Sequence, residues 1–408
     1  MSVLKTNHIY SGDSLKVLKS LPDKSIHMCV TSPPYWGLRD YRTAKWEGGD
    51  ANCGHVGELV AVCPKCGASK IDMQIGNEPT VGEYIDNLCN IFDEVRRVLR
   101  DDGSCWVNIG DTYYGGNRAK SGSDVGRVDP KWKNKNKNDY APNRIKQDGM
   151  LDKSLCLVPS RFAIEMVNRG WVLRSEIIWE KPNAMPSSAK DRFTVNFEKF
   201  FFFTKSPKYF FVTQYEEPKA TLKLFSSTKE RQIDLFDSKS TVGDKGDTVN
   251  LDAPLGRIKR SVWPITTKPY KGSHFATFPF DLIITPLRAC CPRYVCKKCN
   301  FPREYIIKTE HIGSSTKRGG HDIGDNIYKI PNEIAKSKIL GLTECKCNAG
   351  FHGGIVIDPF MGAGTTALVA LKMGLRYVGI ELNEEYIKNA KDRIENVEED
   401  ELFWGDQL

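Results

Sequence analysis

Two loop motifs near opposite ends of the chain contain the residues best suited to chemistry, and the first is Thr31-Ser32-Pro33-Pro34-Tyr35. Its consecutive prolines hold the turn rigid. Such a loop can direct the Ser32 hydroxyl and a carbonyl oxygen at one point, while the Tyr35 ring offers a flat face for stacking. These groups are suited to gripping an exocyclic amine on a planar ring. The structural alternative is a stiff turn with an aromatic plug.

The second motif covers residues 358–366, with the sequence Asp-Pro-Phe-Met-Gly-Ala-Gly-Thr-Thr. Gly362 and Gly364 lack a Cβ atom, so the backbone can turn sharply and a ligand can approach the amide groups at the start of a helix. Glu381 lies about 20 positions beyond the loop, the offset at which a carboxylate meets ribose hydroxyls in nucleotide sites. The pattern predicts a site for an adenosine-bearing ligand. The alternative is an ordinary strand, turn and helix with a surface glutamate.

Eight side chains form two clusters with the spacing of zinc ligands. The first cluster is Cys53, His55, Cys63 and Cys66, and the second is Cys296, Cys299, Cys345 and Cys347. Four such groups close a tetrahedral site that leaves no open position for chemistry, so we predict structural zinc at one or both clusters, with another ligand in place of His55 as an alternative. Disulfides are the weaker explanation in a cytosolic protein. The other cysteines are expected to pack as small hydrophobes: Cys29, Cys89, Cys105, Cys156, Cys290 and Cys291.

Apolar runs place both loop motifs at the ends of buried strands. Residues 25–30 precede the first motif, residues 354–357 precede the second, and residues 376–380 lead to Glu381. Helices are predicted over residues 81–99, where apolar residues recur on one face, and over residues 365–373. With a further strand over residues 104–109, the alternation of strands and helices predicts a largely parallel sheet covered by helices.

The pairing of the two motifs, in this order, resembles the amino-group DNA methyltransferases of the beta arrangement, whose catalytic motif precedes their S-adenosylmethionine motif. Other segments share the resemblance: residues 10–15, 96–111, 177–183, 196–205 and 274–279. The resemblance implies an α/β, Rossmann-like SAM-dependent methyltransferase fold, circularly permuted. It has a mostly parallel sheet with helices on both faces and, here, small zinc-ribbon insertions. Strands over 177–179 and 197–203 would form an antiparallel pair at one edge.

This resemblance divides the chain into two halves of a methyltransferase core and four insertions. The catalytic half comprises residues 1–47 and 76–212, and the SAM-binding half comprises residues 271–289 and 351–408. The insertions are a zinc knuckle (48–75), a flexible basic loop (115–150), a target-recognition segment (213–270) and a zinc ribbon (290–350). The basic loop has nine basic and four acidic residues, so it could order against DNA phosphates or remain a solvated insert.

The resemblance also assigns roles to individual residues. In the catalytic loop, completed by Pro34, the Ser32 side chain and the Pro33 carbonyl would accept the two hydrogens of the target amine, and Tyr35 would stack on the everted base. Glu381 would hold the cofactor ribose. Other cofactor contacts are predicted at Asp358, Pro359, Phe360, Gly362, Gly364, Thr365, Thr366, Phe278 and Pro279. Asp13 would contact cofactor or target, or would belong to a plain turn.

The predicted activity is site-specific transfer of a methyl group from S-adenosylmethionine to the exocyclic N4 amine of cytosine in duplex DNA, by base flipping and direct in-line transfer. Ser32 stands where adenine-N6 enzymes usually have Asp or Asn, and adenine N6 is the alternative. A second alternative is a non-catalytic zinc-ribbon DNA-binding protein. Methylation of protein glutamine or RNA is disfavoured, because the related loop there begins with Asn.

Composition agrees with a polyanionic partner, because the 408-residue chain has a formal net charge of +8. Scattered lysines that aid solubility would explain the charge nearly as well. No secretory signal or bilayer-spanning run is visible, which predicts a cytoplasmic protein without a membrane partner, encoded by a bacterium, archaeon or phage. The resemblance implies duplex DNA as partner and a cognate restriction endonuclease as functional counterpart, and nothing predicts an oligomeric state.

Overall fold

The computed structural model describes residues 4–37, 43, 45–50, 52–55, 62–114, 150–216, 221–226, 229–234, 257–267, 278–313, 333–395, 397–399 and 403–404. The predicted basic loop, apart from Met150, and residues 274–277 of the cofactor-side segment lie outside these ranges. Among the described helices, none combines the length and apolar character needed to cross a membrane.

An eight-stranded sheet forms the centre of the molecule, in the order β1-β18-β17-β2-β5-β7-β6-β12. The strands are β1 (His8–Ser11), β2 (Ile26–Thr31), β5 (Leu99–Ile109), β6 (Val172–Glu180), β7 (Phe197–Thr204), β12 (Val262–Pro264), β17 (Ile355–Asp358) and β18 (Arg376–Glu381). Neighbours from β1 to β5 are parallel, and β7 is antiparallel to both β5 and β6. The largely parallel sheet is therefore confirmed, while the circular permutation stays a prediction.

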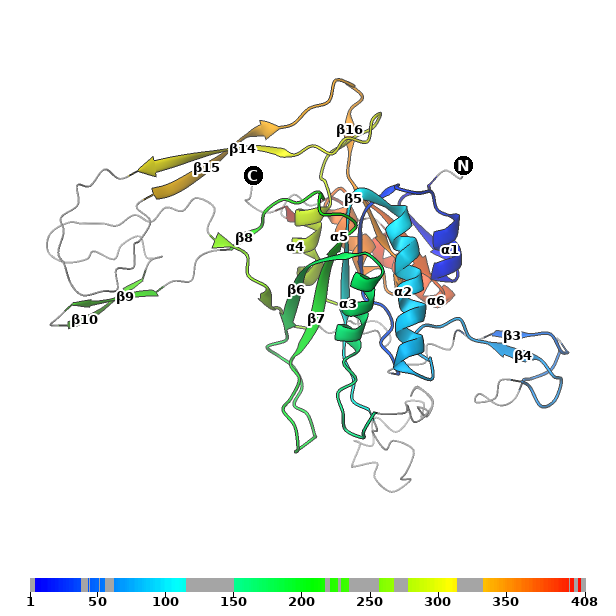
Figure 1. Cartoon of the computed structure of the whole chain (residues 1–408). Coiled ribbons are helices and arrows are strands. Elements are labelled where there is room, and N and C mark those ends of the chain that lie inside the picture. Colours follow the sequence, from blue (N-terminus) through cyan, green and yellow to red (C-terminus); the bar gives the residue numbers. More distant parts are fainter. Residues whose placement is uncertain are drawn as a thin grey trace.

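Helices cover both faces of this sheet (Figure 1). They are α1 (Ser14–Ser20), α2 (Val81–Val98), α3 (Val158–Asn168), α4 (Phe280–Cys290), α5 (Thr365–Lys372) and α6 (Glu384–Ile394). The side chains of α1, α2 and α3 belong to one hydrophobic core, and those of α4, α5 and α6 belong to another. Two buried faces explain why the central strands are apolar along their whole length. The predicted helices over 81–99 and 365–373 are confirmed within a residue or two.

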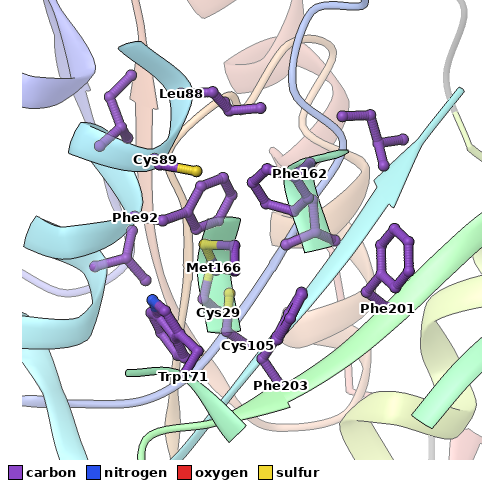
Figure 2. Packing of buried hydrophobic residues seen from close by; sticks show 14 of the residues in the cluster. Cys29, Leu88, Cys89, Phe92, Cys105, Phe162, Met166, Trp171, Phe201 and Phe203 are labelled. Carbon is purple, nitrogen blue, oxygen red and sulfur yellow. The ribbon is translucent and has the colours of Figure 1, made fainter. Parts of the chain in front are cut away.

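The strand β7 illustrates how the sheet separates the two cores. Phe201 and Phe203 point into the core under α2 and α3, and Phe200 and Phe202 point into the opposite core. Figure 2 shows Phe201 and Phe203 in the first core together with Phe162 and the thiol of Cys105. All six cysteines predicted to pack as small hydrophobes are buried, and none of the thirteen cysteines forms a disulfide.

The antiparallel pair of β6 and β7 is confirmed, but it does not form the edge of the sheet. The short strand β12 pairs in parallel with β6 outside it, in register from Val262 opposite Ile178. Its Trp263 is buried and lies near Trp106 and Phe200. A strand of three residues is too short to show a periodic pattern, so the sequence does not predict β12. The buried side chain of Trp263 holds this strand against the sheet.

Within the described ranges, five two-stranded ribbons lie outside the central sheet. They are β3 (Lys45–Glu47) with β4 (Ser69–Ile71), β8 (Tyr215–Glu216) with β11 (Arg257–Ile258), β9 (Thr221–Ser226) with β10 (Lys229–Asp234), β13 (Val295–Cys296) with β16 (Phe351–His352), and β14 (Tyr305–Gly313) with β15 (Glu333–Leu342). The ribbon β3–β4 lies near the start of α2, and β14–β15 lies at the opposite end of the sheet (Figure 1).

Candidate functional site

A hollow opens at the edge where the parallel strands end, between the loops that follow β2, β17 and β18. Counted with its open mouth, it contains about 990 Å³ of space not filled by protein atoms, which is within the size range of small-molecule sites. Nine predicted site residues line it: Asp13, Ser32, Pro34, Phe278, Pro359, Phe360, Gly362, Thr365 and Glu381. The loops at the two ends of the sequence therefore share one cavity.

Ser32 lies directly after β2 with its hydroxyl at the cavity wall. Its Oγ atom is 3.4 Å from Oδ1 of Asn108, the position of a weak hydrogen bond in which the hydroxyl donates. A serine hydroxyl that donates elsewhere keeps its lone pairs for an incoming donor. Ser32 can thus accept a hydrogen bond from the N–H of a ligand amine in the hollow.

Tyr35 does not line the hollow and is held by polar neighbours behind the loop. Its hydroxyl is 2.7 Å from Oε2 of Glu198 and 3.0 Å from Oδ1 of Asn108, and it donates its one proton to the carboxylate. Glu198 also forms an ion pair with Lys181. Burial, followed by the Glu198 charge, raises the pKa of Tyr35 well above its usual range, so the hydroxyl stays protonated.

The rest of the loop is fastened to the segment that leads into α2. The Tyr84 hydroxyl donates to the Pro34 carbonyl at 2.9 Å, and the Trp36 ring nitrogen donates to the carbonyl of Glu78 at 2.8 Å. The backbone N–H of Gly37 donates to the carbonyl of Gly76 at 2.7 Å. Pro33, the predicted hydrogen-bond acceptor, is buried within this loop. Because the loop is already held in place, it loses little further conformational entropy when a ligand binds.

The glycines of the second loop have different partners. Gly362 lines the hollow with φ of +51°, and its N–H donates to Oε2 of Glu381 at 2.8 Å. Gly364 has φ of +76° and is the N-cap residue of α5, but it faces α6, where an added Cβ would lie 2.9 Å from the Cβ of Ala390. The absence of a Cβ at Gly362 therefore leaves space in the cavity, and its absence at Gly364 allows α5 and α6 to pack closely.

Glu381 ends β18 with its carboxylate at the wall of the hollow. Oε1 accepts from the N–H of Asn383 at 2.8 Å, and Oε2 accepts from Gly362. Burial raises the pKa of this carboxyl above its usual range. Each oxygen keeps a lone pair, so the carboxylate can accept two further hydrogen bonds, as a pair of ribose hydroxyls would offer.

Asp358 and Thr366 lie beneath the cavity and do not line it. The Asp358 carboxylate is 1% exposed and accepts from the hydroxyls of Thr31 and Thr366, both at 2.6 Å, and from the N–H of Phe360 at 3.0 Å. Thr31 precedes the first motif, so this carboxylate joins the two loops directly. Pro279 and Pro33 also lie outside the lining.

Asp358 is expected to make stability depend on pH. Burial raises the pKa of its carboxyl to about 6, so the folded protein holds this proton more tightly than the unfolded chain does. The protonated carboxyl therefore contributes fully to the free energy of unfolding below the ordinary aspartate pKa of about 4, and this contribution is lost as the pH rises through about 6. Between pH 4 and pH 7 we expect the wild type to lose about 2–3 kcal/mol relative to an Asp358→Asn variant. Urea unfolding of both proteins measures this, and a constant difference would contradict it.

Three polar residues of the site lay outside the sequence-based prediction: Asn108, Glu198 and Lys181. Each stands in a segment that resembles the family, at the end of an apolar strand or beside one. The signal available in the sequence was Asn108, a polar residue near the end of β5, whose second half is otherwise apolar, because polar groups at that edge of a parallel sheet face the ligand crevice. Asp13 has two roles, since it lines the hollow and its Oδ1 caps α1 by accepting from the N–H of Lys16 at 2.9 Å.

Both predicted metal clusters are assembled. In each, the four sulfur or nitrogen atoms lie within 4.8 Å of one another. Tetrahedral zinc with Zn–S bonds of about 2.3 Å places sulfur ligands about 3.8 Å apart, so the donor sets fit zinc. The first cluster lies on the β3–β4 arm, whose base residues Thr43 and Met73 line the hollow, and the second lies beside β13 and β16 at the other edge.

Comparison with known proteins adds independent information. A family model described as DNA methylase (N6/N4 methyltransferases) matches residues 26–392. The Type II methyltransferase M.XycI of Xanthomonas campestris pv. cyanopsidis is 33% identical over 396 residues, covering 96% of this chain and 89% of that protein. M.SmaI of Serratia marcescens is 32% identical over 394 residues, covering 96% and 92%.

Among solved structures, the PvuII DNA methyltransferase (cytosine-N4-specific) superposes with a TM-score of 0.47 and 16% identity, covering 95% of this chain and 87% of that one. The region matched by the family model contains both loops of the hollow, and the relatives match almost the whole chain. The chain belongs to the N6/N4 DNA methylase family.

Proposed function

We propose that this protein methylates the N4 amine of cytosine in duplex DNA, with S-adenosylmethionine as the methyl donor. The observation that supports the proposal is the shared hollow, which is lined by Ser32 of the first loop, Gly362 of the second loop and Glu381 at the end of β18. A donor held by one loop and an amine held by the other would meet within it. The names of the relatives as Type II methyltransferases support a methyl transfer reaction.

The residues of the hollow suit the two ligands. Glu381 would bind the ribose hydroxyls, while Phe278 and Phe360 supply apolar surface near it. When bound, S-adenosylmethionine supplies an electrophilic methyl group. Ser32 and the Pro33 carbonyl would accept the two hydrogens of the amine, which concentrates the nitrogen lone pair and aims it at that methyl group.

The choice of cytosine depends on the first residue of the catalytic loop. Ser32 has a neutral hydroxyl where adenine-N6 enzymes of the family usually have Asp or Asn. Both target amines present the same pair of hydrogens, so adenine N6 is the alternative. Residues 213–270 would read the recognition sequence, because they belong to no shared motif and base contacts differ for each sequence.

Nucleoside analysis tests the reaction and the base together. The full chain is incubated with mixed-sequence duplex DNA and S-adenosylmethionine labelled in the methyl group, and the DNA is digested to nucleosides. Labelled N4-methylcytosine is expected. Labelled N6-methyladenine would overturn the choice of base, and bound but unlabelled DNA would favour a non-catalytic DNA-binding protein.

Methylation-sensitive sequencing of DNA from cells that express the chain would then give the recognition sequence. Protection of this DNA against an endonuclease of the same specificity would support a place in a restriction–modification system. The DNA partner and the endonuclease counterpart are both part of the proposal.

Structural zinc is proposed at both cysteine clusters. We expect the purified protein to contain close to two zinc ions per chain, because each cluster gathers four ligands of the right kind. A Cys63→Ser/Cys66→Ser variant and a Cys296→Ser/Cys299→Ser variant should each retain one ion by elemental analysis. The control is Cys290→Ser, which changes a buried thiol outside both clusters and should keep two. Full zinc content in either double variant would contradict the assignment of that cluster.

A further inference from the structure

The connection between β6 and β7, residues 181–196, extends from the catalytic edge of the sheet (Figure 1). Since β6 and β5 are both antiparallel to β7, β6 ends at the same edge as β5, beyond which the Ser32 loop lies. Lys181 begins the connection and is paired with Glu198, which accepts the hydrogen bond from Tyr35. This connection, which we name the β6–β7 finger, is thus joined to the catalytic loop.

The β6–β7 finger presents large apolar side chains to solvent. Phe193 is 96% exposed, Met185 is 88% exposed and Val195 is 51% exposed. Isolated exposed hydrophobic residues are common, but three on one short segment beside a candidate active site indicate a surface that contacts a partner.

The charge of the β6–β7 finger identifies the chemistry of that partner. Residues 181–196 include three basic side chains, Lys181, Lys190 and Arg192, and one acidic side chain, Asp191. Basic residues interleaved with apolar ones are suited to a polyanion with apolar surfaces inside it, which describes a DNA duplex with stacked bases.

Side chains on neighbouring segments support the backbone around Phe193. The Arg192 guanidinium lies 3.6 Å from the centre of the Tyr113 ring, and Lys153 pairs with Asp191 at 2.8 Å. Asn183 accepts a hydrogen bond from the N–H of Thr267 at 2.9 Å. A side chain on a supported backbone loses less conformational freedom when it inserts into a partner.

Building on the proposed function, we propose that Phe193 enters the duplex beside the target base pair and fills the space left by the everted base. Flipping a base costs the free energy of its lost stacking and pairing. Apolar side chains inserted between bases are a known means of holding DNA open. The Phe193 ring would stack on the bases above and below the gap, while Lys190 and Arg192 contact nearby phosphates.

The test compares two duplexes that contain the recognition sequence. In one the target cytosine is paired with guanine, and in the other it faces an abasic site, so that no pair has to be broken. A Phe193→Ala variant should lose about tenfold or more in kcat/KM on the paired duplex and should approach the wild type on the abasic duplex. A Phe193→Leu variant, which retains apolar bulk, should recover most of the loss.

The matched control is Ile164→Ala, which removes a 64% exposed apolar side chain from α3. It should leave methylation of both duplexes unchanged. Unchanged activity of Phe193→Ala on the paired duplex, or an equal loss on both duplexes, would overturn the role of Phe193 while the wild-type activity still upheld the proposed function. A wild type that methylates neither duplex would overturn both.

Discussion

Replacing Ser32 by alanine should lower kcat for DNA methylation by about a hundredfold or more, the scale expected when a hydrogen-bond partner of the reacting group is lost. The Ser32 hydroxyl lies at the wall of the hollow and donates toward Asn108, which leaves its lone pairs for the amine. Without this acceptor the amine lone pair stays delocalised into the ring. Single-turnover kinetics with saturating DNA and cofactor measures the loss.

The affinity for S-adenosylmethionine should change far less in the Ser32→Ala variant, because the proposed cofactor contacts lie elsewhere, at Gly362 of the second loop and at Glu381 at the end of β18. Calorimetric titration of the cofactor separates the two effects. Ser206→Ala is the matched control, since Ser206 is half-buried like Ser32 but follows β7 at the opposite edge of the sheet, where its hydroxyl lies near the backbone carbonyls of Asp101 and Lys208. A Ser32→Ala variant that retained the wild-type kcat would exclude the proposed role of the hydroxyl.

Replacing Gly110 by alanine should reduce methylation by about a hundredfold while the protein remains folded, because small displacements of catalytic groups are costly. The Cβ of the new residue would lie 2.5 Å from Cε2 and 2.8 Å from Cδ2 of Tyr35. The ring cannot simply rotate away, since its hydroxyl is held by Glu198 and Asn108. The catalytic loop itself has to shift.

Gly82→Ala provides the comparison for Gly110→Ala. Gly82 lies in the first turn of α2, where an added Cβ would come no closer than 3.9 Å to the atoms around it. Alanine is favourable in a helix, so this variant should keep full activity and gain slightly in stability. Circular dichroism and thermal unfolding would show whether Gly110→Ala is folded. A folded and fully active Gly110→Ala variant would mean that the position of Tyr35 does not matter for methyl transfer.

The sequence predicted the meeting of the two loops because each motif is contiguous and follows a buried strand. Residues 25–30 and 354–357 correspond to β2 and β17, which are adjacent and parallel, so their loops emerge side by side. The metal clusters were predictable for a similar reason, since the spacing of their cysteines is local within each half of a cluster. Patterns formed by residues that are close in the chain can be recognised from the sequence alone.

The polar residues behind the catalytic loop could not be assigned from sequence. Tyr35, Asn108 and Glu198 come from three separate segments, and only the pairing of β5 with β7 brings the last two together. The close approach of Gly364 to Ala390 could not be predicted for the same reason, because Ala390 belongs to the separate helix α6. Asp358 matched the motif, but its burial beneath the cavity depends on the hydroxyls of Thr31 and Thr366. Such contacts join residues that are far apart in the sequence, so the spacing of residues within a motif does not predict them.

The late position of β17 affects how this protein can be synthesised. Thr31 leaves the ribosome 327 residues before Asp358, its hydrogen-bond partner in the centre of the finished sheet. Until then β2 has an open side, because its neighbour there has not yet been made. An open strand edge favours wrong pairings and aggregation, so the growing polypeptide carries this exposed edge until β17 has been made. A nascent chain that stops before β17 therefore lacks one wall of the hollow.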